Sequence, residues 1–239
     1  MATSQPLAAQ AGIEIMQKGG NAIDAAIATA ASLTVLEPTS NGIGSDAFAL
    51  VWVKGKLHGL NASGPAPKAI SVEKVKALGY KEMPIHGWIP VTVPGAPGAW
   101  AELSKRFGKL PLSDVLQPAI RYAREGYAIT PTLGYLWKKA YEAYRQELKG
   151  EEFAAWFDTF CPQGRPPEIG EIWSSEDHAR TLELIAESNA EAFYRGELAE
   201  KIDEASRKAG GFLRQEDLAA FYPEWVEPIK INYRGYDVW

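Results

Sequence analysis

The chain has 239 residues, of which 46% are hydrophobic and 23% charged, and its net charge is -5 at pH 7. The length allows one large domain or two small ones, and this acidic balance offers no basic field for nucleic acid or anionic lipid. The longest apolar run, Ala25 to Leu36, is too short and too polar to span a bilayer. The N-terminal stretch "MATSQPLAAQ" lacks the features of a signal peptide, so a natural start at Met1 would predict a cytoplasmic protein.

Two helices are predicted at the start of the chain. Leu7, Ala8, Ala11 and Ile15 recur at helical spacing, and the glycines of "KGGN" end this helix. Asn21 is predicted to cap the second helix, "AIDAAIATAASLTVL". Because that segment is apolar almost all round, we expect it to be buried on most faces.

A Gly-rich loop, "TSNGIGSD", leads into a predicted β-hairpin. Its strands cover 47–53 and 57–63, with a turn at Lys54-Gly55-Lys56. Asp46 stands directly before the first strand, which we expect to be buried. A buried carboxylate must be paired or hydrogen-bonded. Two interpretations of Asp46 are therefore open: it binds amides of its own loop, or it faces a ligand.

The rest of the chain is predicted to be mainly helical, from about residue 96 to 221. Ser71 begins a short helix, and the segment after it is too rich in Pro and Gly for regular structure. Further helices are predicted at 97–107, 114–125, 132–148, 176–188, 198–209 and 214–221. The C-terminal "EPIKINYRGYDVW" predicts a hairpin turning at Arg234-Gly235. Because the chain stops inside a strand, we expect it to be part of a longer polypeptide.

No catalytic constellation is visible in the residues alone. The single cysteine, Cys161, has no histidine near it in sequence and is interpreted as a structural thiol. The three histidines lack metal-ligand spacing, so no metal is predicted. Neither Gly-rich segment matches a phosphate-binding motif, so no cofactor is predicted either.

The order of the segments resembles the gamma-glutamyltranspeptidase family. Six stretches of the sequence resemble family motifs and follow in the family's order: "GGNAIDAAIATAASLTVLEP", "NGIGSDAFALVW", "VPGAPGAWAELSKRFGKLPLSDVLQPAIRYAREGYAIT", "FYRGELAEKI", "GGFLRQEDLAAF" and "INYRGYDVW". They cover nearly the whole chain, and "GGNAIDAA" together with "LQPAIRYAREG" is highly specific. The resemblance identifies residues 1–239 as the N-terminal part of a large subunit, forming a portion of a single domain.

That resemblance implies an α+β fold, the αββα sandwich of N-terminal-nucleophile hydrolases, of which this chain holds only the N-terminal portion. It implies a precursor that cleaves itself into two subunits, so that the small subunit from the same precursor would be the partner. The N-terminal Thr of that subunit would attack a γ-glutamyl amide such as glutathione. No catalytic residue is then expected in this chain, which should be inactive alone. Members of the family are often periplasmic or secreted.

One departure from the family pattern concerns the substrate. The family has a motif like D-x-R-E-x-A-P after the hairpin, and its Arg grips the α-carboxylate of the substrate. Here the matching stretch is "NASGPAP", with Asn61 in the Asp place, Ser63 in the Arg place and Gly64 in the Glu place. We therefore predict that Ser63, Asn61, Gly64 and Asp46 are substrate-binding residues of a branch that lacks the Arg, as in cephalosporin-acylase-like members.

Three hypotheses about function follow. The first is an amidohydrolase or acyltransferase of the transpeptidase type that prefers an acyl group other than γ-glutamyl, such as a cephalosporin or glutaryl acylase. The second is an ordinary γ-glutamyl hydrolase whose carboxylate clamp lies elsewhere, with Lys68, Lys54 or Lys56 as candidates. The third is a catalytically inactive binding or scaffold homologue. Exposed apolar edges would also favour a homo-oligomer.

Overall fold

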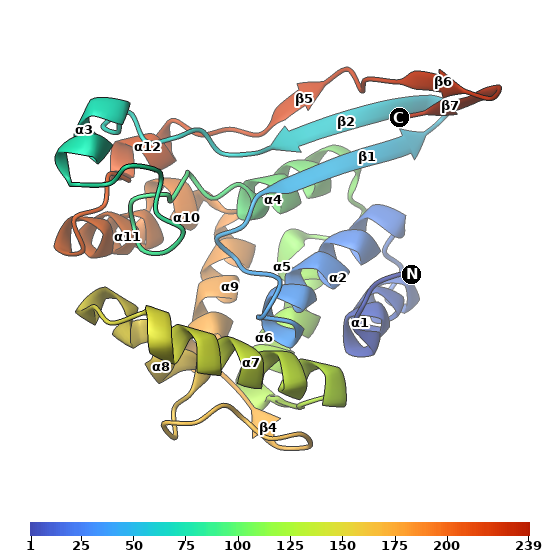
Figure 1. Cartoon of the computed structure of the whole chain (residues 1–239). Helices are drawn as coiled ribbons and strands as arrows, with labels where there is room; N and C mark the ends of the chain where they lie inside the picture. The colour runs from blue at the N-terminus through green and yellow to red at the C-terminus, as the bar shows by residue number, and fades with distance from the viewer.

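The computed structural model describes residues 1–239. A small antiparallel sheet lies along one side of a larger helical body (Figure 1). The longer helices are α1 (Pro6–Gln17), α2 (Ala22–Leu36), α4 (Ala96–Phe107), α6 (Gln117–Glu125), α7 (Pro131–Glu147), α9 (Glu176–Ser188) and α11 (Glu197–Lys208). The shorter ones are α3 (Val72–Ala77), α5 (Leu112–Val115), η1 (Glu151–Phe153), α8 (Ala154–Phe160), α10 (Glu191–Arg195) and α12 (Gln215–Ala219). The predicted α+β class is confirmed.

The main sheet has the strand order β1-β2-β5, formed by β1 (Ala47–Val53), β2 (Lys56–Ala62) and β5 (Glu224–Val226). The β1–β2 hairpin turns at Lys54 and Gly55, with φ values of 50° and 77°. Positive φ at both central residues matches the right-handed twist of the strands, which confirms the predicted turn. A second hairpin, β6 (Ile231–Tyr233) and β7 (Tyr236–Val238), turns at Arg234 and Gly235 as predicted. Two-residue strands β3 (Tyr127–Ala128) and β4 (Ile172–Trp173) pair separately.

The second helix begins at the cap that its sequence predicts, and it packs closely against the first. The Asn21 side chain accepts bonds from the amides of Ile23 and Asp24, and the Asp24 carboxylate accepts the Asn21 amide at 2.9 Å. This reciprocal capping box satisfies amides that have no partner inside the helix. Small residues let α1 and α2 lie close together, since a Cβ added at Gly12 would sit 2.5 Å from Thr29 Oγ1.

The prediction of one helix at 114–125 is wrong. The structure has two helices here, α5 and α6. Leu116 is the C-cap of α5 and the N-cap of α6. Pro118 explains the break, because it has no N–H to donate to the preceding turn and its ring crowds the carbonyl four residues earlier. Pro111 is the N-cap of α5, and the Ser113 side chain makes no capping hydrogen bond there.

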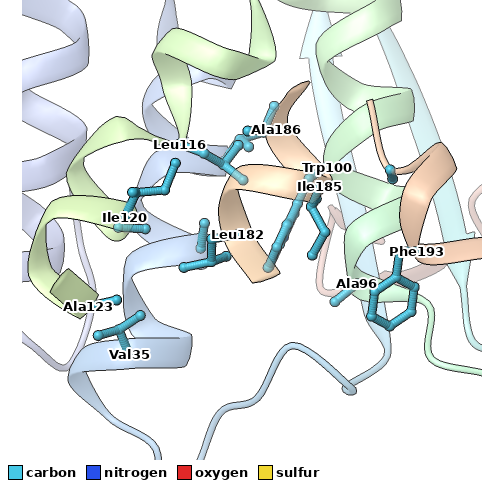
Figure 2. Packing of buried hydrophobic residues seen from close by; sticks show 14 of the residues in the cluster. Val35, Ala96, Trp100, Leu116, Ile120, Ala123, Leu182, Ile185, Ala186 and Phe193 are labelled. Carbon is cyan, nitrogen blue, oxygen red and sulfur yellow. The ribbon is translucent and has the colours of Figure 1, made fainter. Parts of the chain in front are cut away.

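The core lies between the sheet and the helices, and among the helices themselves. Figure 2 shows Val35 of α2, Ile120 of α6 and Leu182 of α9 converging in it, and each is at most 2% exposed. Trp100 of α4 and Phe193 of α10 extend the cluster toward the sheet. No helix combines the length and the hydropathy needed to cross a bilayer.

The opposite face of the sheet carries no helix. Phe48, Leu50 and Trp52 point to that side, and their exposed fractions are 70%, 55% and 68%. The expectation of a buried first strand is therefore wrong for this face, although Val51 on the other face is buried. Asp46, at the start of the strand, is likewise exposed and not buried as expected. Alternation of side chains explains the difference, because only every second residue of β1 faces the helices.

Candidate functional site

The four residues predicted to bind substrate lie together at one end of the sheet. Strand β1 begins where β2 ends, with Ala47 opposite Ala62 and Phe48 opposite Asn61. This register brings Asp46 beside the segment that follows β2. Because side chains alternate along a strand, Asn61 shares the open face of the sheet with its partner Phe48.

Hydrogen bonds close this end of the hairpin into a compact loop. The amide of Gly64 donates to Asp46 Oδ1 at 3.2 Å, and the amide of Ser63 donates to Asn61 Oδ1 at 2.9 Å. Of the two interpretations of Asp46, the structure shows amide binding, but the amide belongs to the 61–67 segment and not to the Gly-rich loop. Asp46 Oδ2 accepts no hydrogen bond within the chain, so half of this exposed carboxylate remains available.

Gly64 occupies its position because another backbone passes directly over it. A Cβ added there would stand 1.6 Å from the carbonyl oxygen of Val93. A Cβ added at Gly95 would stand 1.7 Å from the carbonyl oxygen of Ala62. No side chain fits at either crossing. Gly64 is therefore required by this backbone contact.

No cation stands beside the Asp46 carboxylate, which forms none of the ion pairs in the structure. Lys54 and Lys56 lie at the other end of strands of seven residues, roughly 20 Å away by strand rise. That distance exceeds the reach of a lysine side chain. Lys68 is closer in sequence, and its backbone amide donates to Asp217 Oδ1 at 3.0 Å. The stretch around Ser63 is thus small and polar, and no guanidinium or ammonium group forms an ion pair with the Asp46 carboxylate beside it.

A hollow of about 720 Å³ on the open face of the sheet is lined by Phe48 and Asn61, and two further hollows adjoin this end of the sheet from the other side. One of about 380 Å³ is bordered by Ala66 and Pro67, and it is lined mostly by apolar side chains of α3 and the segment after it. Another of about 650 Å³ lies beneath the Gly-rich loop at Ile43 and Gly44, against α10 and α11. Both fall in the size range of small-molecule sites.

The other candidate groups take structural places. Cys161 is buried, and burial raises the pKa of its thiol to about 11, which suits a packing role and not a nucleophile. His178 is partly enclosed by Phe160 and Trp173 and shares a 2.9 Å hydrogen bond with Ser175, the cap of α9. Burial lowers the pKa of His178. No group of three or more His, Cys, Asp or Glu side chains is arranged to hold a metal ion.

The arrangement of hairpin, Gly-rich loop and surrounding helices can be compared with known proteins. A family model described as Gamma-glutamyltranspeptidase matches residues 8–239. The chain belongs to the gamma-glutamyltranspeptidase family. The resemblance expected from the motifs is thus confirmed.

Relatives within the family carry two kinds of name. The chain is 35% identical to the glutathione hydrolase-like YwrD proenzyme of Bacillus subtilis (strain 168), over 98% of this chain and 43% of that protein. It is also 35% identical to the acylase ACY 1 proenzyme of Pseudomonas sp. (strain SE83), over 99% of this chain and 43% of that protein. The chain therefore spans less than half the length of these relatives.

Solved structures agree on the fold. The crystal structure of cephalosporin acylase from Bacillus halodurans is 65% identical with a TM-score of 0.97, over 99% of this chain and 44% of that one. Helicobacter pylori gamma-glutamyltranspeptidase is 31% identical with a TM-score of 0.89, over 99% of this chain and 68% of that one. This chain therefore has the fold of these family members and covers only part of each.

Sequence reasoning did not predict that the segment from Val93 to Gly98 contacts the two arms of the site, which are the chain around Asp46 and the chain from Asn61 to Pro65. It also missed Tyr194, whose hydroxyl contacts that segment. A signal was present in "VPGAPGAW", where a glycine stands at the cap position of α4 in place of Ser, Asp or Asn. A glycine cap offers no side-chain oxygen, so the first amides of the helix must bond to water or to another segment.

Proposed function

We propose that this chain forms the N-terminal part of the large subunit of an amidohydrolase or acyltransferase of the cephalosporin-acylase type. The observation that carries the proposal is the wall at Ser63, where a small loop and the exposed carboxylate of Asp46 replace the expected Arg. The 65% identity to a protein titled cephalosporin acylase supports the same assignment.

Electrostatics at this wall disfavour a γ-glutamyl substrate. Removing one partner of a buried, charge-assisted carboxylate contact costs roughly 2–5 kcal/mol, or about 30-fold and more in affinity. Asp46 adds repulsion toward a second carboxylate. An acyl group whose far end is neutral avoids both effects and can hydrogen-bond to Ser63 or Asn61. We therefore propose that the substrates are amides whose acyl group ends, at the far side from the amide bond, in a neutral group or in a group that the site binds only weakly.

The nucleophile is proposed to come from a small subunit made from the same precursor. Two observations support such a partner. The relatives are named proenzymes, and the open face of the sheet presents Phe48, Leu50 and Trp52 to a second layer. Asp46 and Asn61 lie at the end of this same face. A reacting Thr delivered by a layer packed there would stand near the proposed acyl wall.

The test compares three p-nitroanilides with the full-length, self-processed protein: γ-glutamyl, glutaryl and 4-carbamoylbutanoyl, the neutral amide counterpart of glutaryl. We expect the highest kcat/KM for the neutral acyl group and the lowest for γ-glutamyl. Ser63→Arg should lower the KM for γ-glutamyl anilide by about tenfold or more, and Ser63→Met, a similar length without charge, should not. A wild-type preference for γ-glutamyl that Ser63→Arg fails to increase would overturn the proposal.

That last result would favour the second candidate, a glutathione hydrolase with a relocated clamp, which the 35% identity to a glutathione hydrolase-like protein keeps open. A processed, folded protein with no activity on any of the three anilides would favour an inactive scaffold homologue instead.

A further inference from the structure

The segment from Val93 to Gly98 holds both arms of the proposed acyl site. The amide of Val93 donates to the carbonyl of Pro65 at 3.1 Å. The amides of Gly95 and Ala96 donate to the carbonyl of Ser45 at 3.0 and 2.8 Å. One segment thus fixes the residue before Asp46 and the residue after Gly64, and the bond between Asp46 and Gly64 joins the two arms.

The backbone crossing prevents this segment from capping its own helix. Gly95 is the N-cap of α4 and makes no side-chain cap bond. The usual capping residues, Ser, Thr, Asp and Asn, all carry a Cβ. That atom would stand 1.7 Å from the carbonyl oxygen of Ala62, so none of them fits at Gly95. The amide of Ala96 already donates to Ser45 and Pro97 has no N–H, so the amide of Gly98 is the one in the first turn that needs an acceptor from elsewhere.

Tyr194 supplies that acceptor from α10. Its hydroxyl accepts the amide of Gly98 at 3.0 Å and donates to the carbonyl of Pro94 at 2.8 Å. The side chain is only 3% exposed, and its ring packs against Phe221 with centroids 5.3 Å apart. One hydroxyl therefore bridges the two ends of the turn that carries Gly95, from a residue about a hundred positions away in sequence.

We propose that Tyr194 is a positioning residue for acyl recognition. It touches no part of the proposed site, but it fixes the 93–98 segment, which in turn fixes Asp46, Gly64 and Pro65. The acyl selectivity of the enzyme then depends on a buried hydroxyl behind the site wall. This inference rests on the proposed function, because it concerns how the same wall is held.

The test uses Tyr194→Phe in the full-length, processed protein, with Tyr127→Phe as the matched control. The Tyr127 hydroxyl is also buried and donates to a backbone carbonyl, that of Val35, at 2.9 Å, but it contacts neither arm of the site. Tyr194→Phe should raise the KM for the preferred anilide by about tenfold and reduce the selectivity among the three anilides, with a smaller change in kcat. Tyr127→Phe should lower Tm but keep the wild-type selectivity.

Amide hydrogen exchange gives a readout that needs no activity. Tyr194→Phe should speed exchange in peptides covering 43–47 and 61–66, and Tyr127→Phe should not. If Tyr194→Phe does not fold, Gly98→Ala replaces it, since the added Cβ would sit 3.0 Å from the Tyr194 hydroxyl and displace it without removing it. Unchanged selectivity and unchanged exchange at both arms would overturn the positioning role. If the wild-type protein cleaves none of the three anilides but Tyr194→Phe still speeds amide exchange at both arms, the proposed function alone would be overturned.

Discussion

The two faces of the β1–β2 sheet differ in what covers them. On the helix side Val51, Leu60 and Ala62 are at most 6% exposed, and α4 packs directly beneath both strands. On the open side Phe48, Leu50 and Trp52 are more than half exposed. A strand that is apolar on both faces is typical of a sheet lying between two layers. This chain therefore covers one face of its own sheet and leaves the other face open, and the proposed acyl site lies at the end of that open face.

The largest effect should come from the covered side. Leu182 of α9 is fully buried among α2 and α6. Leu182→Ala should lower the free energy of unfolding by about 2–5 kcal/mol, because it removes apolar contacts and leaves a cavity. Urea unfolding of the purified protein measures this change. A loss below about 1 kcal/mol would show that this side is loosely packed, contrary to the burial of its residues.

A smaller loss is expected at the capping box. The buried Asp24 carboxylate accepts the amide of Asn21 at 2.9 Å and that of Lys109 at 3.0 Å, so it joins α2 to the end of α4. Asp24→Ala should cost about 1–3 kcal/mol, because two amides lose their acceptor. Asp114→Ala is the control, since Asp114 is exposed in the first turn of α5. Equal losses for the two variants would contradict a special role of Asp24.

The ion pair between Glu14 and Arg121 predicts a modest pH dependence on the covered side. Hydrogen bonds from Arg121, the shorter at 2.6 Å, hold the pKa of Glu14 at about 2, below its ordinary 4.5. A depressed folded-state pKa stabilises the protein above pH 4.5 and loses that contribution as pH falls toward 2. Because Arg121 is 38% exposed, solvent screening reduces the contribution to about 1 kcal/mol.

Glu14→Gln should therefore lower stability at pH 7 by about that amount and make the fall between pH 4.5 and pH 2 less steep. Denaturant unfolding at several pH values measures both quantities. An unchanged slope in the variant would assign the acid sensitivity to other carboxylates.

In this chain alone, the smallest effect should come from the open side. Leu50→Ser should change the unfolding free energy of this chain alone by less than about 0.5 kcal/mol, because Leu50 is already 55% exposed. It should also reduce self-association, measured by sedimentation, since it interrupts an apolar patch. In the full-length protein the same substitution should cost about 2–5 kcal/mol if a second layer covers this face. A negligible cost there would remove the support that this face gives to the proposed small-subunit contact.

Local sequence determined most element ends. The Asn21 capping box, the Ser71 and Ser175 caps and the glycine turns of both hairpins act within a few residues, so their outcomes can be predicted from short stretches. The break between α5 and α6 at Leu116 could also be predicted from the local sequence, because Pro118 disrupts the helical turn just before it. The four proposed site residues also lie close together, because a hairpin brings the start of one strand to the end of the next, but their role in substrate binding stays a prediction.

Tertiary structure decided the rest. Strand β5 has three residues and forms only because Trp225 and its neighbours pair with β2, far away in sequence. Asp46 is exposed because this chain leaves one face of the sheet uncovered. The residues around Asp46 do not show whether that face is covered. Gly64 and Gly95 are required where two backbones cross, and Tyr194 caps α4 from another helix. These features depend on contacts between distant segments, so only the assembled fold could decide them.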